Sequence, residues 1–145
     1  MIKALQAFLT GLFFTFLFDF SLFLGLKLHY IDAHGIKLFF NPFFADNQNV
    51  IVLLALTIFI GWITMYQRSI KTAIIVLSLF ALISASALIP QIGSKFGDAL
   101  FRKGNQQITI APHTYRGDIL YIDRQKLYFF DTDLQRLITL PKEKK

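Results

Sequence analysis

The chain contains no cysteine and few charged residues. Without cysteine, it can form no disulfide, no thiolate metal site and no cysteine nucleophile. Charged residues make up 17% of its 145 residues and hydrophobic residues 54%, whereas charged residues approach about a quarter of an ordinary soluble domain. Water is therefore a poor solvent for most of this chain. The sequence also lacks paired carboxylates, a Ser-His pair and a recognised metal-ligand spacing, so we expect no enzymatic activity and no cofactor.

Three long apolar runs are present, over residues 5–26, 50–66 and 70–89. At about 1.5 Å per residue, each can form a helix that crosses or nearly crosses a hydrocarbon core of roughly 30 Å. Only the short polar link Tyr66-Gln67-Arg68-Ser69-Ile70-Lys71 separates the second run from the third, which favours an immediate return. The first run has no Ala-x-Ala cleavage pattern and should be retained. We expect a membrane α-helical fold with a bundle of three transmembrane helices over residues 1–90.

Each run carries a stripe of small or polar residues at helical spacing. Small residues allow close approach of another helix, so the stripes should face protein rather than lipid. They could meet within one three-helix bundle or contact neighbouring subunits. The stripes consist of Ala7, Gly11, Thr15 and Asp19 in the first run, Thr57, Gly61 and Thr64 in the second, and Ser78, Ala81, Ser84 and Ala85 in the third.

Asp19 is the ionisable residue inside an expected span, and such a group is a candidate for ion or proton handling. No basic residue inside any expected span can pair with it. Counting helical rise from one membrane face places Asp19 and Ser84 at similar depth, so Ser84 or Ser86 is the expected partner. A structural hydrogen bond, a contact with a partner subunit and a transport path all remain open.

The connection over residues 27–49 is too apolar for a free loop. Pro42 prevents one continuous helix through its aromatic segment. We expect this segment to lie in the membrane interface, with Phe39, Phe40, Phe43 and Phe44 toward lipid or a partner.

His29, Asp32 and His34 form the cluster in this sequence with metal-ligand chemistry, to which His113 could add a fourth ligand. One turn of helix cannot bring the first three together. We therefore expect a solvated polar loop without a metal.

After Pro90 the pattern changes twice. Residues 91–105 have apolar residues at helical intervals and predict an amphipathic helix on the membrane surface, with Lys95, Arg102 and Lys103 toward lipid head groups. Residues 106–145 alternate with a period of two between turn sequences and predict a four-stranded antiparallel β meander outside the membrane, with a basic end. Such a small unit must dock on the bundle, on a copy of itself or on another protein.

Three spans followed by a small β module resemble, in outline, the small-conductance mechanosensitive channels. Gly117-Asp118-Ile119, followed by Asp131-Thr132-Asp133 and Leu140-Pro141, is similar to their β-domain pattern. The third run departs from that family because it lacks the Gly/Ala-dense repeat that lines their pore. The resemblance implies a channel as one hypothesis and does not assign the family.

From these observations we expect a non-enzymatic subunit or scaffold of a larger membrane assembly, or alternatively a homo-oligomeric channel or transporter with Asp19 facing the path. The expected partners are membrane lipids and other subunits or copies of the chain. Nucleic acid is not expected, because the basic excess has no accompanying recognition motif.

We expect an integral protein of a bacterial inner membrane. The Lys/Arg count near the span ends, five against three, favours a cytoplasmic tail.

Overall fold

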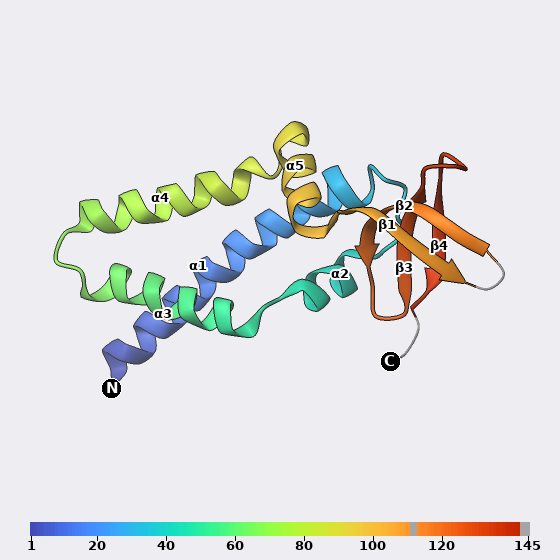
Figure 1. Cartoon of the computed structure of the whole chain (residues 1–145). Helices are drawn as coiled ribbons and strands as arrows, with labels where there is room; N and C mark the ends of the chain where they lie inside the picture. The colour runs from blue at the N-terminus through green and yellow to red at the C-terminus, as the bar shows by residue number, and fades with distance from the viewer. Residues whose placement is uncertain (111–112, 143–145) are drawn as a thin grey trace.

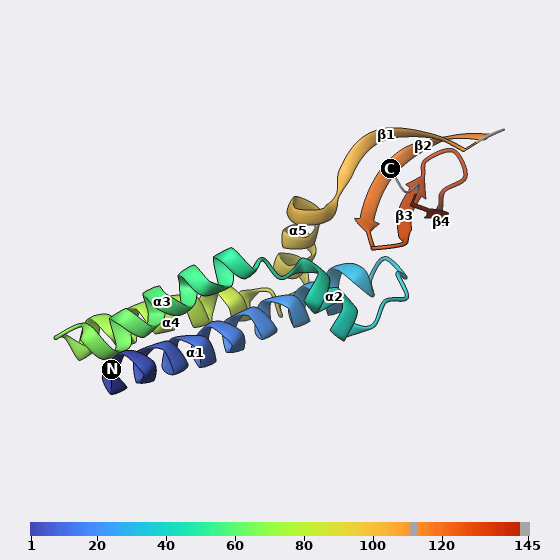
Figure 2. The same cartoon turned by 90° about the horizontal axis from the view of Figure 1, so that it is seen from below.

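A computed structural model of the chain describes residues 1–110 and 113–142. The helices lie together at one end of an elongated molecule and an antiparallel sheet lies at the other (Figures 1 and 2). In chain order the elements are α1 (Ile2–Leu26), the π-helical turn η1 (Lys27–Ile31), α2 (Phe40–Asn47), α3 (Val50–Tyr66), α4 (Ile70–Ser86), α5 (Pro90–Phe101), β1 (Lys103–Ile110), β2 (His113–Ile122), β3 (Lys126–Asp131) and β4 (Arg136–Pro141).

α1 runs into η1, and together they form a helix over Ile2–Ile31 that is long and apolar enough to cross a membrane. The other two apolar helices, α3 and α4, have 17 residues each. They reach the length of a span only when joined to α2 and α5, from which they bend by 81° and 87°. The bends follow from local chemistry: the Asn49 side chain accepts from the backbone of Val52 and caps α3, and Pro90 begins α5.

α1 packs most extensively against α3, through their small residues. A Cβ added to Gly11 would overlap the Thr57 carbonyl, and one added to Gly61 would overlap the Ala7 carbonyl. The two backbones therefore touch at this crossing. α3 and α4 diverge from their short link toward the sheet end, so they make few contacts with each other (Figure 1).

The sheet is a meander with strand order β1-β2-β3-β4, and every pair is antiparallel. The prediction of four antiparallel strands from the period of two is thus confirmed. The preceding helix, however, ends at Phe101, so its predicted end at Asn105 is wrong. Residues 103–105 already belong to β1, where Asn105 takes a positive φ of 54° at an irregularity in the pairing.

The connection over residues 27–49 is more ordered than the expected interfacial loop, because η1 and α2 occupy much of it. One face of the sheet packs on these elements and on α5. The buried residues of this core are Leu26, Tyr30, Ile31, Ile36, Phe43, Leu120, Tyr121 and Tyr128. A second cluster around Phe129, Ile119 and Leu140 fills the other side of the sheet. The β module was expected to dock on the helices, on a copy of itself or on another protein. In the structure it packs on the helical layer of its own chain.

Candidate functional site

A cavity of about 170 Å³ lies where α1, α3 and α4 separate near the sheet end. Asp19 and Thr15 of α1 and Ser84 of α4 line it together. The remaining lining is apolar and consists of Phe18, Leu22, Leu56, Ile60, Phe80 and Ile83. Asp19 and Ser84, which helical rise placed at similar depth, therefore line the same cavity.

Ser84 or Ser86 was the expected partner of Asp19, but no hydrogen bond joins Asp19 to either serine among the described residues. Ser84 Oγ donates to the Phe80 carbonyl at 2.9 Å, and Ser86 Oγ donates to the Ile83 carbonyl at 2.6 Å. The Gln48 side chain instead approaches the Asp19 carboxyl, but its buried Nε2 atom completes no hydrogen bond within the described chain. Thr15 Oγ1 is also buried there without a partner. The cavity thus holds a carboxyl group and two hydroxyl groups with unused hydrogen-bonding capacity.

The expected packing residues divide between the inside and the outside of the helix group. Ala7, Gly11 and Gly61 lie buried between α1 and α3. Ala81 and Ala85 lie on the exposed side of α4. The stripe on the first helix is therefore used within the chain, whereas most of the stripe on α4 is open.

The second concentration of polar chemistry is the junction between the helices and the sheet. Tyr30 donates to the Leu120 carbonyl at 3.0 Å, and Asn47 donates to the Tyr121 hydroxyl at 2.9 Å. Asp46 forms an ion pair with Arg124 in the turn before β3. Each contact joins a helical segment to the sheet across a long sequence separation. The module is therefore held by directional bonds as well as by apolar burial.

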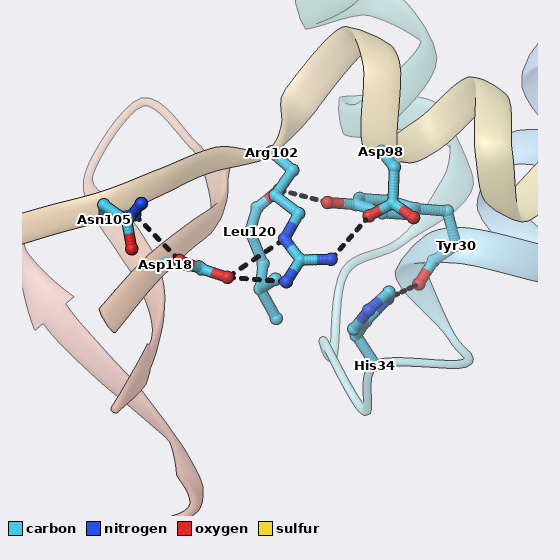
Figure 3. Close-up of polar contacts among 7 residues, drawn as sticks. All are labelled: Tyr30, His34, Asp98, Arg102, Asn105, Asp118 and Leu120. Carbon is cyan, nitrogen blue, oxygen red and sulfur yellow. Dashed lines mark hydrogen bonds and ion pairs between the residues drawn. The ribbon is translucent and has the colours of Figure 1, made fainter. Parts of the chain in front are cut away.

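Arg102 and Asp118 form a second ion pair of this junction (Figure 3). The guanidinium donates to Asp118 Oδ2 at 2.6 and 3.1 Å and to Asp98 at 3.4 Å. The Asn105 backbone amide donates to Asp118 Oδ1 at 2.9 Å. The hydrogen bond from Arg102, followed by that from Asn105, holds the pKa of Asp118 below its usual range. The pair links the end of α5 to the second strand.

An aromatic cluster surrounds these polar contacts. The rings of this cluster pack tilted or edge to face, with centroids between 5.3 and 5.8 Å apart, and belong to Tyr30, Phe43, Phe101 and Tyr121. Burial raises the pKa of Tyr121, so its phenol stays protonated at neutral pH. The chemistry of this region is that of a rigid joint, with no nucleophile or acid–base pair at its centre.

The residues expected at the lipid interface have different environments. Phe39 is 84% exposed, and Lys95 and Lys103 are exposed. Phe40 and Phe44 are half-buried and pack on α1 through Phe20 and Phe16. Phe43 is fully buried in the aromatic cluster, and Arg102 is engaged by Asp118. Phe43 and Arg102 thus support the junction of the helices with the sheet, Phe43 through its burial against Tyr121 and Arg102 through its ion pair with Asp118.

His29, Asp32 and His34 do not converge. His29 bonds the Leu88 carbonyl at 2.9 Å, His34 bonds the Tyr30 carbonyl at 2.7 Å, and Asp32 pairs with Lys27. Within residues 1–110 and 113–142, no group of three or more acidic or histidine residues is arranged to hold a metal ion.

The sequence did not predict the contacts of Tyr30, Asn47 and Asp118, because each joins segments that lie far apart in the chain. One signal was available: Gly93 and Gly97 are four residues apart in α5, and an added Cβ at Gly97 would overlap the Tyr30 ring. No protein-family model, curated protein or solved structure matches this chain.

Proposed function

We propose that the chain crosses a membrane three times, through α1, α3 and α4. Support comes from the distribution of side chains on these helices: small residues of α1 and α3 are buried against each other, and large apolar residues of all three helices point outward. Soluble proteins rarely expose apolar patches of this extent. The exposed positions include Leu5, Phe13, Phe16 and Leu17 of α1, Ile51, Ile58 and Trp62 of α3, and Ile75, Leu79 and Leu82 of α4. The right-angled bends to α2 and α5 suit segments that lie along the membrane surface.

The membrane we propose is a bacterial inner membrane, with the sheet on the cytoplasmic side. Lys3, Tyr66 and Arg68 lie at the end of the helices away from the sheet, where the Lys3 ammonium sits 4.8 Å from the Tyr66 ring centroid. The sheet end carries more Lys and Arg near the helix ends, and positive residues favour the cytoplasm.

In this membrane we propose a non-enzymatic subunit or scaffold of a larger assembly. The observation that supports it best is the open side of α4. Only Ala73 and Ser84 of this helix are buried, while Ser78, Ala81 and Ala85 face outward. Small residues on the outside of a membrane helix allow another helix to approach closely. The sheet supports the proposal less, because its docking surface is filled by the chain itself.

Native mass measurement of the gently solubilised protein tests this function. We expect a species heavier than one chain, and Ala81→Leu should reduce its abundance because the larger side chain blocks close approach. Ile74→Leu, at an already large exposed position of the same helix, is the control. A single monomeric species with a folded sheet would contradict the proposal.

The alternative is a homo-oligomeric channel or transporter, and the cavity beside Asp19 supports it. A carboxyl group in an otherwise apolar space between helices is a plausible point on an ion path. In that case Asp19→Asn should abolish flux in reconstituted vesicles without changing assembly. Absence of flux from the unmodified protein would end this alternative.

A further inference from the structure

Asp19 is a charge without a counter-charge. α1, α3 and α4 contain two further charged residues, Lys3 and Lys71, and both are at the opposite end of the helix group. None of the ion pairs within residues 1–110 and 113–142 includes Asp19. Ionisable residues within membrane helices usually pair with another group, because an isolated charge is poorly solvated there. Beside Asp19 the described chain supplies only the neutral side-chain amide of Gln48 and no cationic group.

The other polar atoms of the cavity are suited to accept hydrogen bonds. Ser84 Oγ directs its proton to the backbone carbonyls of Phe80 and Ala81, at 2.9 and 3.3 Å, which leaves its lone pairs free. Thr15 is 1% exposed, and its Oγ1 has no partner among the described residues. A carboxylate and two hydroxyl oxygens thus line a space whose remaining walls are aliphatic or aromatic. The matching occupant has several N–H donors at the end of an apolar stem.

The size of the space agrees with one side chain. The cavity measures about 170 Å³, and an engineered protein cavity of about 150 Å³ binds benzene, which has six heavy atoms. The butylammonium group of lysine has five. A bare metal ion fits less well, because Ca²⁺ or Mg²⁺ takes about six or more oxygen ligands and apolar groups dominate these walls.

We propose that this cavity receives the lysine side chain of a transmembrane helix from a different protein, with the ammonium bound by Asp19. The inference rests on the proposed role as a subunit and names the chemistry of the partner. A second copy in the same orientation offers no free amine at this depth. At about 1.5 Å per residue, its Lys3 lies roughly 24 Å along the helix from Asp19 and its Lys27 roughly 12 Å, and Lys27 already pairs with Asp32. Ile83, which is 52% exposed, lines the cavity and lies on the side from which a neighbour can enter.

A photo-crosslinking residue at Ile83, in cells that express the full chain, tests the inference. We expect a covalent adduct with another membrane protein, mapped by mass spectrometry to an apolar helix that contains lysine. Asp19→Asn should lower the adduct yield at least about tenfold, because removing one member of a buried ion pair leaves the other uncompensated. Asp19→Glu should retain it. Replacing the mapped lysine by methionine should reproduce the loss.

Two matched controls distinguish a specific Asp19 contact from misfolding of the variant and from nonspecific crosslinking to nearby membrane proteins. Asp133→Asn, the same chemical change at an exposed position of the β3–β4 turn, should leave the adduct intact. The same crosslinker at Ile74, on the opposite side of α4, should not give a yield that depends on Asp19. Membrane levels of each variant, measured in parallel, exclude loss of the protein as the cause.

The outcomes distinguish this inference from the proposed function. An adduct that survives Asp19→Asn, or one confined to lipid or to a second copy, overturns the lysine site. A heavier native assembly together with such a result leaves the subunit role standing. A monomer in the native mass measurement overturns both.

Discussion

At the scale of single residues, the contact of α1 with α3 depends on two glycines. Gly11 and Gly61 lie where each backbone meets a carbonyl of the other helix, so the crossing leaves no room for a Cβ. Neither glycine has a positive φ in the structure, and close approach rather than backbone conformation requires them. The sequence pattern located these positions, but the identity of the facing carbonyls needed coordinates.

Gly11→Leu should therefore destabilise the helix group by about 3 kcal/mol, because overpacked positions cannot relax when backbone atoms are the obstacle. Thermal unfolding in detergent, followed by the single Trp62, measures the effect. Ala81→Leu, on the open side of α4, is the matched control and should leave protomer stability within about 0.5 kcal/mol. Equal loss in both variants would contradict the packing account.

The acid sensitivity of the joint should follow Asp118. Because its pKa in the folded state lies below the unfolded value of about 3.9, ionised Asp118 stabilises the fold fully above that value. The contribution is lost as pH falls through the lower folded pKa. The protection factors of the β2 amides, which compare their exchange with the intrinsic rate at each pH, should fall in that acid window. Asp118→Asn should cost roughly 1 kcal/mol at neutral pH and remove this part of the pH dependence.

At the scale of elements, the sheet depends on the helical layer on which it packs. Phe43 of α2 lies fully buried against Phe101 and Tyr121. Its place in a phenylalanine-rich segment of the sequence predicted a contact with lipid or a partner. The structure assigns it to the joint because α2 turns this residue toward the sheet while Phe39 stays outside.

Phe43→Ala should weaken docking of the sheet by about 3 to 5 kcal/mol, the usual cost of removing a buried phenylalanine. Limited proteolysis of the β2–β3 and β3–β4 turns should become faster, while the helices stay in the membrane. Phe39→Ala removes an exposed ring from the same segment and should leave the cleavage rate unchanged. Comparable cleavage in both variants would show that the aromatic cluster does not hold the sheet.

At the scale of the whole molecule, the proposed crossings place the α3–α4 link and the sheet on opposite sides of the membrane. The absence of native cysteine makes this directly measurable with single-cysteine variants. Ser69→Cys should react with a membrane-impermeant maleimide in spheroplasts. Thr132→Cys, in the exposed turn before β4, should react only in inverted vesicles. Reaction of both from one side would contradict the three-span topology.

The apolar runs and the small-residue stripes were predictable from the sequence because helical and strand periods are local properties. The bounds of α3 and the presence of four antiparallel strands followed from such patterns. The end of α5 did not, since residues 103–105 pair with a strand that lies later in the chain. The environments of Phe43 and Arg102 also depended on that distant partner.

The sequence by itself determined that long helices with unusually little charge precede a short antiparallel meander. The spacing of apolar residues and the polarity of each segment are local properties of the chain and can be identified without coordinates. Only the tertiary structure decided that the meander rests on the chain's own helices, that α4 keeps its small side open, and that Asp19 shares a cavity with Thr15 and Ser84. These features arise from contacts between segments far apart in the chain, which no local pattern specifies.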